Sequence, residues 1–171
     1  MRNWSLSLIE DVCCRLREDE YWYSRLTTTQ NQQTPRNFHL AVFVEPILQF
    51  VLDGKKTVES RFSINRCAPY SVVESGDIVL IKGSGGPVKA IAEVTNVWSY
   101  ELAGSEIEAI KKRFGTLLWV NDTFWHSKAN CCYATLMKLS KLKTFDPVPC
   151  AKKDRRGWVV LNEQQPRLAG L

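Results

Sequence analysis

The stretch from Gly54 to Arg61 (Gly-Lys-Lys-Thr-Val-Glu-Ser-Arg) decides how the rest of the chain is interpreted. A short helix is predicted directly before it, over residues 46–54, because a proline suits the first helical turn and a glycine suits a left-handed helix stop. The residues that follow alternate as a strand, which places Glu59 and Arg61 on one face. Lys56 falls at the turn and can point to the same side. Three charged side chains are therefore expected together beside a helix end.

A lysine, a carboxylate and an arginine within six residues can serve two purposes. They can form an ion cluster that satisfies itself, as many surface clusters do. They can also line a polar pocket, in which the cations would hold a phosphate or a base carbonyl and the carboxylate would accept from an exocyclic amine. Spacing alone leaves both alternatives open.

Composition restricts the class of protein. The chain has 171 residues, of which 44% are hydrophobic and 24% charged, as expected for one globular domain with an appended element. Its net charge of +5 favours an anionic partner such as nucleic acid. No apolar run is long enough to span a membrane, and the N-terminus lacks the pattern of a signal peptide. We expect a cytoplasmic location and no membrane partner.

The first third of the chain divides into an amphipathic helix over residues 1–26, a linker over 27–37 and the start of a compact domain near Phe38. The helix carries apolar residues at helical spacing, namely Leu8, Val12, Leu16, Trp22 and Leu26. This stripe can dock on the domain or bind a protein partner, and the sequence does not choose between them. The linker is polar and lacks periodicity.

The remaining elements are short strands with interspersed helices. A capping box at Ser105 starts a helix that runs to Arg113 and ends at Phe114-Gly115. Other predicted elements are a strand over 39–44, a hairpin of strands over 77–82 and 88–98, a helix over 122–128, and strands over 131–142 and 158–161. Residues 162–171 form a tail. Because β-α-β alternation is absent, we predict an α+β fold: a small β-barrel with peripheral helices.

Four residues of the opening stretch match the signature Gly-x-Lys-x-x-Glu-x-Arg of the ASCH family: Gly54, Lys56, Glu59 and Arg61. Further matches follow in order, at Val44-Glu45-Pro46, Gly76-Asp77, Tyr133-Ala134 and Phe145-Asp146-Pro147. The chain therefore resembles an ASCH domain over residues 38–161. The resemblance implies a PUA-like β-barrel with a cleft beside the signature strand, and an RNA-binding role in RNA metabolism or in the regulation of transcription or translation.

The same resemblance implies an alternative, a metal-independent hydrolase that uses Lys56 and Glu59. Some bacterial family members remove an acyl group from a modified cytidine with a Thr nucleophile. That Thr aligns with Glu59 here, which weakens the amidohydrolase interpretation. Other members are ribonucleases, and Glu59 with Lys56 and Arg61 could activate a 2′-hydroxyl and stabilise a phosphorane.

Further ligand contacts are predicted outside the signature. Five basic side chains and one aromatic side chain could touch phosphate or a base, and these are Lys82, Trp125, Lys152, Lys153, Arg155 and Arg156. Other aromatic residues between positions 98 and 133 can stack on bases or fill the core. Neither a cofactor nor a metal is predicted, because the six cysteines lack metal-ligand spacing and only two histidines occur. We expect the cysteines to be reduced and half-buried.

Overall fold

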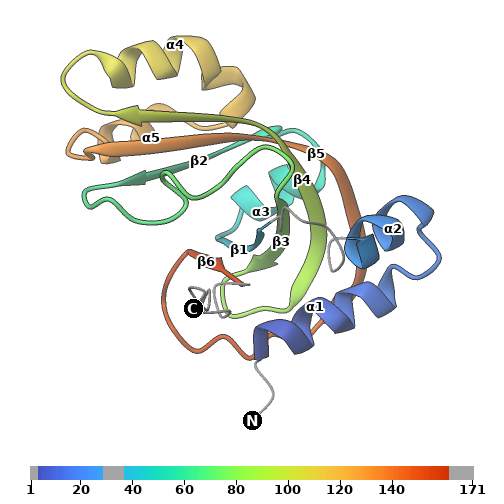
Figure 1. Ribbon diagram of the computed structural model, residues 1–171. Coiled ribbons are helices and arrows are strands. Elements are labelled where there is room, and N and C mark those ends of the chain that lie inside the picture. Colours follow the sequence, from blue (N-terminus) through green and yellow to red (C-terminus); the bar gives the residue numbers. More distant parts are fainter. Residues whose placement is uncertain (1–3, 29–36, 162–171) are drawn as a thin grey trace, which may run out of the picture.

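The computed structural model describes residues 4–28 and 37–161, which fold into helices around one strongly curled sheet (Figure 1). The strands are β1 (Phe38–Phe43), β2 (Val58–Ser63), β3 (Ile78–Gly83), β4 (Val88–Glu101), β5 (Tyr133–Val148) and β6 (Trp158–Val160). The helices are α1 (Trp4–Arg15), α2 (Glu20–Thr28), α3 (Ile47–Leu52), α4 (Glu106–Leu118) and α5 (Asp122–Ser127). The prediction of an α+β fold built on a barrel-like sheet is confirmed.

The sheet has the order β2-β5-β4-β3-β1-β6, and only the β1–β3 pair of these described strands is parallel. The predicted hairpin of β3 and β4 is confirmed. Bulges interrupt the pairing of the long strands β4 and β5 at three places. Bulges bend a strand and increase its twist, so these two strands curve and carry the sheet into a half-barrel (Figure 1). The two edge strands, β2 and β6, face each other across the gap that leaves the half-barrel open.

Residues 4–26 form two helices and not the single helix that their periodicity predicts. The chain turns at Asp19, whose carboxylate accepts a hydrogen bond from the backbone N–H of Trp22 and so caps α2. The apolar stripe lies in the core beside residues of β1, β3 and β4. The indole N–H of Trp22 also donates to the carbonyl of Lys141 in β5. The stripe therefore packs on the chain's own sheet.

Helix α4 differs from its prediction at both ends. Ser105 makes no capping hydrogen bond through its side chain; instead the Glu106 carboxylate accepts from the backbone N–H of Ala103. The helix continues past Gly115 to Leu118, because Phe114 and Leu118 are buried against β2 and β5. Packing of this apolar face outweighs the cost of a glycine inside the helix.

Other boundaries also differ from their predictions. The strand predicted to end at residue 142 continues to Val148, since it pairs with β4 along its whole length. Helix α2 runs to Thr28, into the predicted linker 27–37. Residues 29–36 of that linker and the predicted tail 162–171 lie outside the described residues.

Candidate functional site

The three charged residues of the signature meet in one buried ion cluster. Nε of Arg61 lies 2.8 Å from Oε1 of Glu59, and Nζ of Lys56 lies 3.5 Å from Oε2 of the same carboxylate. The alternation of β2 and the turn before it therefore place all three on one side, as predicted. The side chains of Lys56 and Glu59 are only 3% and 6% exposed. This cluster, Lys56-Glu59-Arg61, is called the ion cluster below.

Arg61 closes the gap between the two edges of the sheet. Its Nη1 donates to the carbonyl of Gly157, just before β6, and its Nη2 donates to the carbonyl of Val42 in β1. The guanidinium also lies over the rings of Phe43 and Trp158, at 5.1 and 5.4 Å from their centroids. A planar fork of donors suits this role, since it can bond two carbonyls and stack at once. One side chain thus links β2 to the far end of the sheet.

Lys56 holds the C-terminal end of α4. Its Nζ donates to the carbonyl of Leu118 at 2.8 Å, which satisfies an orphan acceptor and complements the helix dipole. Burial lowers the pKa of Lys56 below its ordinary value; Glu59 opposes this shift, and Arg61 adds to it. The amine therefore lies inside the protein, where it bonds the carbonyl of Leu118 and pairs with Glu59.

Two pockets flank the ion cluster. The first, of about 180 Å³, is called the strand pocket, and its walls include Arg61, Phe62, Cys67, Tyr70, Thr135 and Trp158. The side-chain hydroxyl of Thr135 is buried, and the described residues offer it no hydrogen-bond partner. Lys56 and Glu59 do not line this pocket. They lie behind Arg61, which differs from the expectation that all three residues line one cleft.

A buried relay fixes the Trp158 wall of the strand pocket. The indole N–H of Trp158 lies 3.1 Å from Nδ1 of His39, and Nε2 of His39 lies 2.9 Å from a carboxylate oxygen of Asp77. An indole can only donate, so Nδ1 accepts and the proton of a neutral imidazole sits on Nε2, facing Asp77. Asp77 also accepts from the backbone N–H groups of Asn37 and Glu74. The ring of Trp158 is therefore held in one orientation.

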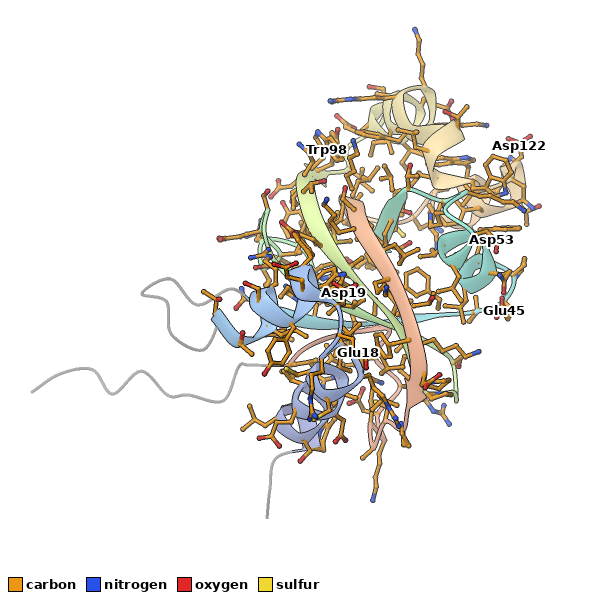
Figure 2. All side chains as sticks on the ribbon, turned by 90° about the vertical axis from the view of Figure 1, so that its right-hand side faces the viewer. Glu18, Asp19, Glu45, Asp53, Trp98 and Asp122 are labelled. Atoms are coloured by element: carbon orange, nitrogen blue, oxygen red, sulfur yellow. The ribbon has the colours of Figure 1, made fainter. Side chains whose placement is uncertain are left out.

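The second pocket, of about 920 Å³, lies between α3, the end of α4 and α5, and is called the helix pocket. In Figure 2 the labelled Asp53, after α3, and Asp122, at the start of α5, mark this side of the molecule. Its walls include Ile47, Phe50, Lys112, Trp119, Phe124 and Trp125. Phe62 of the strand pocket packs edge-on against Phe124 and Trp125, so one aromatic layer separates the two pockets.

The remaining predicted contact residues divide between these regions. Trp125 is buried in the wall of the helix pocket, while Lys82 is buried in β3 and lines neither pocket. The four basic residues of the segment 152–156 lie in the loop that leads into Gly157 and Trp158. Two of them, Lys152 and Arg156, pair with Asp154. Hydrogen bonds to the Asp154 carboxylate, the largest contribution from Arg156 and the next from Lys152, hold its pKa well below the ordinary value.

The cysteines differ in part from their prediction. They are free thiols, but only Cys13, Cys131 and Cys150 are half-buried, whereas Cys14, Cys67 and Cys132 are exposed. Within residues 4–28 and 37–161, no group of His, Cys, Asp and Glu side chains is arranged to hold a metal ion. No helix in the same described ranges is long and apolar enough to cross a membrane.

Comparison with known proteins identifies the fold. No family model matches the sequence, and no curated protein matches it significantly. Among solved structures, ASCH from Zymomonas mobilis superposes with a TM-score of 0.59 at 12% identity, over 74% of this chain and 88% of that one. The chain has an ASCH-type fold. A Ser-to-Ala variant of the Zymomonas protein gives a TM-score of 0.61 at 13% identity, over 75% of this chain and 90% of that one.

A third solved structure has a similar fold. A protein from Enterococcus faecalis of family DUF984 matches with a TM-score of 0.50 at 11% identity, over 73% of this chain and 86% of that one. At such identities the likeness is one of fold. The three charged signature residues of this chain form the ion cluster, which joins β2, α4 and the β6 edge.

Sequence reasoning missed the residues that line the strand pocket beside Arg61. Thr135 directly follows the matched pair Tyr133-Ala134 but is not itself part of the match, and Tyr70 lies in a segment that carries no motif. Both reach the pocket through the pairing of β5 with β2 and the course of the loop before β3. Trp119 is one of the aromatic residues between positions 98 and 133, and nothing local distinguishes it from the others. Its place at the end of α4 does not follow from a helix predicted to stop at Arg113.

Proposed function

We propose that the chain is a single-stranded RNA-binding module whose strand pocket receives one unpaired base. The observation that carries the proposal concerns Thr135, a residue of the pocket wall whose buried hydroxyl has no hydrogen-bond partner among the described residues. A buried polar group left without a hydrogen bond costs about 1–3 kcal/mol. A ligand atom that bonds this hydroxyl recovers that cost.

The other walls suit a planar polar ring. Tyr70 and Trp158 supply aromatic surface, and Arg61 supplies a cation whose face already stacks on aromatic rings. Proteins that read RNA hold unstacked bases against aromatic or guanidinium planes and bond their edges. A volume of about 180 Å³ suits a single base better than a duplex segment. An unpaired base is therefore the favoured occupant.

The basic loop beside the pocket supplies contacts for the backbone phosphates. Lys153 and Arg155 are exposed, and the ion pairs of this loop are made by their neighbours Lys152 and Arg156. The loop continues directly into Gly157 and Trp158, two residues of the pocket wall. A base in the strand pocket would thus have its phosphates within reach of exposed cations, as electrostatic binding of single strands requires.

A charge-reversal experiment tests the proposal. Binding of a short single-stranded RNA should weaken steeply with salt, and the double variant Lys153→Glu/Arg155→Glu should lower the affinity about tenfold or more. The matched control is Arg15→Glu/Arg17→Glu, which changes the net charge equally at exposed positions of the N-terminal region. Equal losses of affinity in the two double variants would mean that RNA binding depends only on the net charge of the protein, which would contradict the proposal.

A second measurement locates the base. Cys67 is exposed and lines the strand pocket, so a variant that keeps only this cysteine reports occupancy by its rate of alkylation. Bound RNA should slow the reaction, and Thr135→Val should weaken the protection while the domain stays folded. Thr123→Val, at an exposed position of α5 that lines neither pocket, is the control and should leave the protection unchanged. RNA that binds without slowing the alkylation occupies another surface.

A further inference from the structure

The helix pocket contains an unusual backbone conformation at its wall. Trp119, the residue after α4, has φ 52° and ψ 51°, in the left-handed region that glycine or asparagine normally takes at a helix end. The residue is 49% exposed although it lines the pocket. A bulky side chain in this conformation persists only where the surroundings enforce it, and such positions concentrate at binding sites.

The surroundings do enforce it. Lys56 of the ion cluster bonds the carbonyl of Leu118, and the backbone N–H of Thr57 donates to the carbonyl of Leu117, so both carbonyls before Trp119 are fixed. The ring of Phe50 meets the indole edge-on at 6.3 Å. Lys56, a buried charge of the signature, therefore helps to position a half-exposed indole in the wall of a pocket that Lys56 itself does not line.

Charge at the rim completes the description of the pocket. Lys111 is neutralised by Asp122, at 2.8 Å. The next residue, Lys112, is exposed, lines the same pocket, and forms no ion pair with the described residues. The rim thus carries one uncompensated positive charge above aromatic walls. A volume of about 920 Å³ falls within the range of about 300–1,000 Å³ usual for small-molecule sites.

We infer that the helix pocket binds a nucleotide, with its base stacked on Trp119 and its phosphate at Lys112. Aromatic faces bind planar bases regardless of sequence, and a lysine binds phosphate as a point charge. The nucleotide can be free or part of a strand. If the nucleotide is part of a strand, the inference rests on the proposed function. The bound RNA would then place one base in the strand pocket and another nucleotide in the helix pocket, on the other side of the aromatic layer that separates them.

A titration with adenosine 5′-monophosphate, followed by NMR of the indole N–H signals, tests the inference. The chain has six tryptophans, and the signal of Trp119 is assigned by its loss in Trp119→Gly, which suits the left-handed backbone. We expect this signal to shift, and Lys112→Gln to weaken binding about tenfold. Leu117→Gln, exposed on the same helix but outside the pocket, is the control and should bind normally.

The ligand series separates the two contacts. Adenosine should bind more weakly than its monophosphate, and inorganic phosphate alone should leave the Trp119 signal in place. An unmoved signal at millimolar nucleotide would overturn the inference. Tighter binding of an acidic, aromatic peptide than of the nucleotide would overturn it as well, because the pocket would then be a protein-docking site.

A short single-stranded RNA distinguishes the two sources of the nucleotide. If it binds more tightly than the monophosphate and loses affinity in both Trp119→Gly and Lys153→Glu/Arg155→Glu, one strand crosses both pockets. If it binds no more tightly, the ligand is a free nucleotide. Suppose that the Trp119 signal shifts, but that Lys153→Glu/Arg155→Glu does not change RNA binding. This result would support the nucleotide site in the helix pocket and contradict the proposed function. RNA binding that depends on the loop, with Trp119 silent, would remove this site alone.

Discussion

The ion cluster and the helix pocket lie on either side of the end of α4, and they differ in almost every physical respect. The ion cluster is densely charged, but Lys56 and Glu59 are buried and its hydrogen bonds run to carbonyls of its own chain. The helix pocket is walled mainly by aromatic and aliphatic side chains, yet it is open and has at its rim a lysine that no described residue pairs with. The region richest in functional groups is the one that a ligand reaches least.

The difference shows that charge density in a motif does not by itself mark a binding surface. Taking charges out of water requires partners that satisfy them, so a buried cluster is committed to the structure that buries it. Its contribution to binding is then indirect: it fixes Arg61 as a pocket wall and fixes the turn that presents Trp119. Four predictions, in decreasing order of expected effect, test this division of roles.

The largest effect is expected from removing the carboxylate at the centre of the ion cluster. Glu59→Ala leaves Lys56 and Arg61 without their common partner inside the protein, and breaking a buried pair in this way costs about 3–5 kcal/mol of unfolding free energy. Urea denaturation measures the loss. Glu101→Ala, which breaks the exposed pair with Arg66, is the control and should cost at most about 1 kcal/mol. Similar losses at the two sites would mean that the cluster is no more important than a surface pair.

A smaller effect is expected when the charge of Arg61 is kept and its shape is lost. Lysine cannot bond the carbonyls of Gly157 and Val42 together, so Arg61→Lys should lose about 2–3 kcal/mol. Amide exchange in β6 should accelerate, because this edge loses its link to β2. The control is Arg113→Lys, which replaces a guanidinium that lies over an aromatic ring, 5.6 Å from the centroid of Trp98. Unchanged exchange in β6 would show that Arg61 does not close the sheet.

The helix pocket should respond in the opposite way. Trp119→Gly relieves the left-handed backbone but removes contact with Phe50, and these opposing terms should leave the unfolding free energy within about 1 kcal/mol of the parent. Thermal and urea unfolding measure this. A loss comparable to that of Glu59→Ala would make Trp119 a structural residue and erase the contrast between the two regions.

The smallest effect is a change in the pH dependence of stability. The pKa of Lys56 is lower in the folded protein than its ordinary value of 10.5. Between the folded-state pKa and 10.5, the amine is protonated in the unfolded chain but has lost its proton in the folded chain. The free energy of unfolding should therefore rise with pH through this window. Lys56→Met should remove this part of the rise, as measured by urea denaturation at a series of alkaline pH values. An identical slope in the parent and the variant would mean that Lys56 is not desolvated.

Local patterns predict most of the strands and the side to which the signature residues point. Alternation in β2 is sufficient to place Glu59 and Arg61 together, since the strand period fixes which side chains share a face. The same reasoning fails at α4, where Phe114 and Leu118 carry the helix past a glycine only because β2 and β5 lie beneath them. It fails again at residue 19, where periodicity does not detect the turn between α1 and α2.

The α+β class, the strand that carries the signature and the gathering of three charges on one side of it all follow from local patterns along the chain. What those charges do depends on three-dimensional packing. Lys56 finds its acceptor 62 residues away and Arg61 finds one 96 residues away. Burial is a property of such distant partners, and no local period encodes it. For the same reason the stretch from Gly54 to Arg61 carries a buried ion cluster, while the open pockets lie beside it.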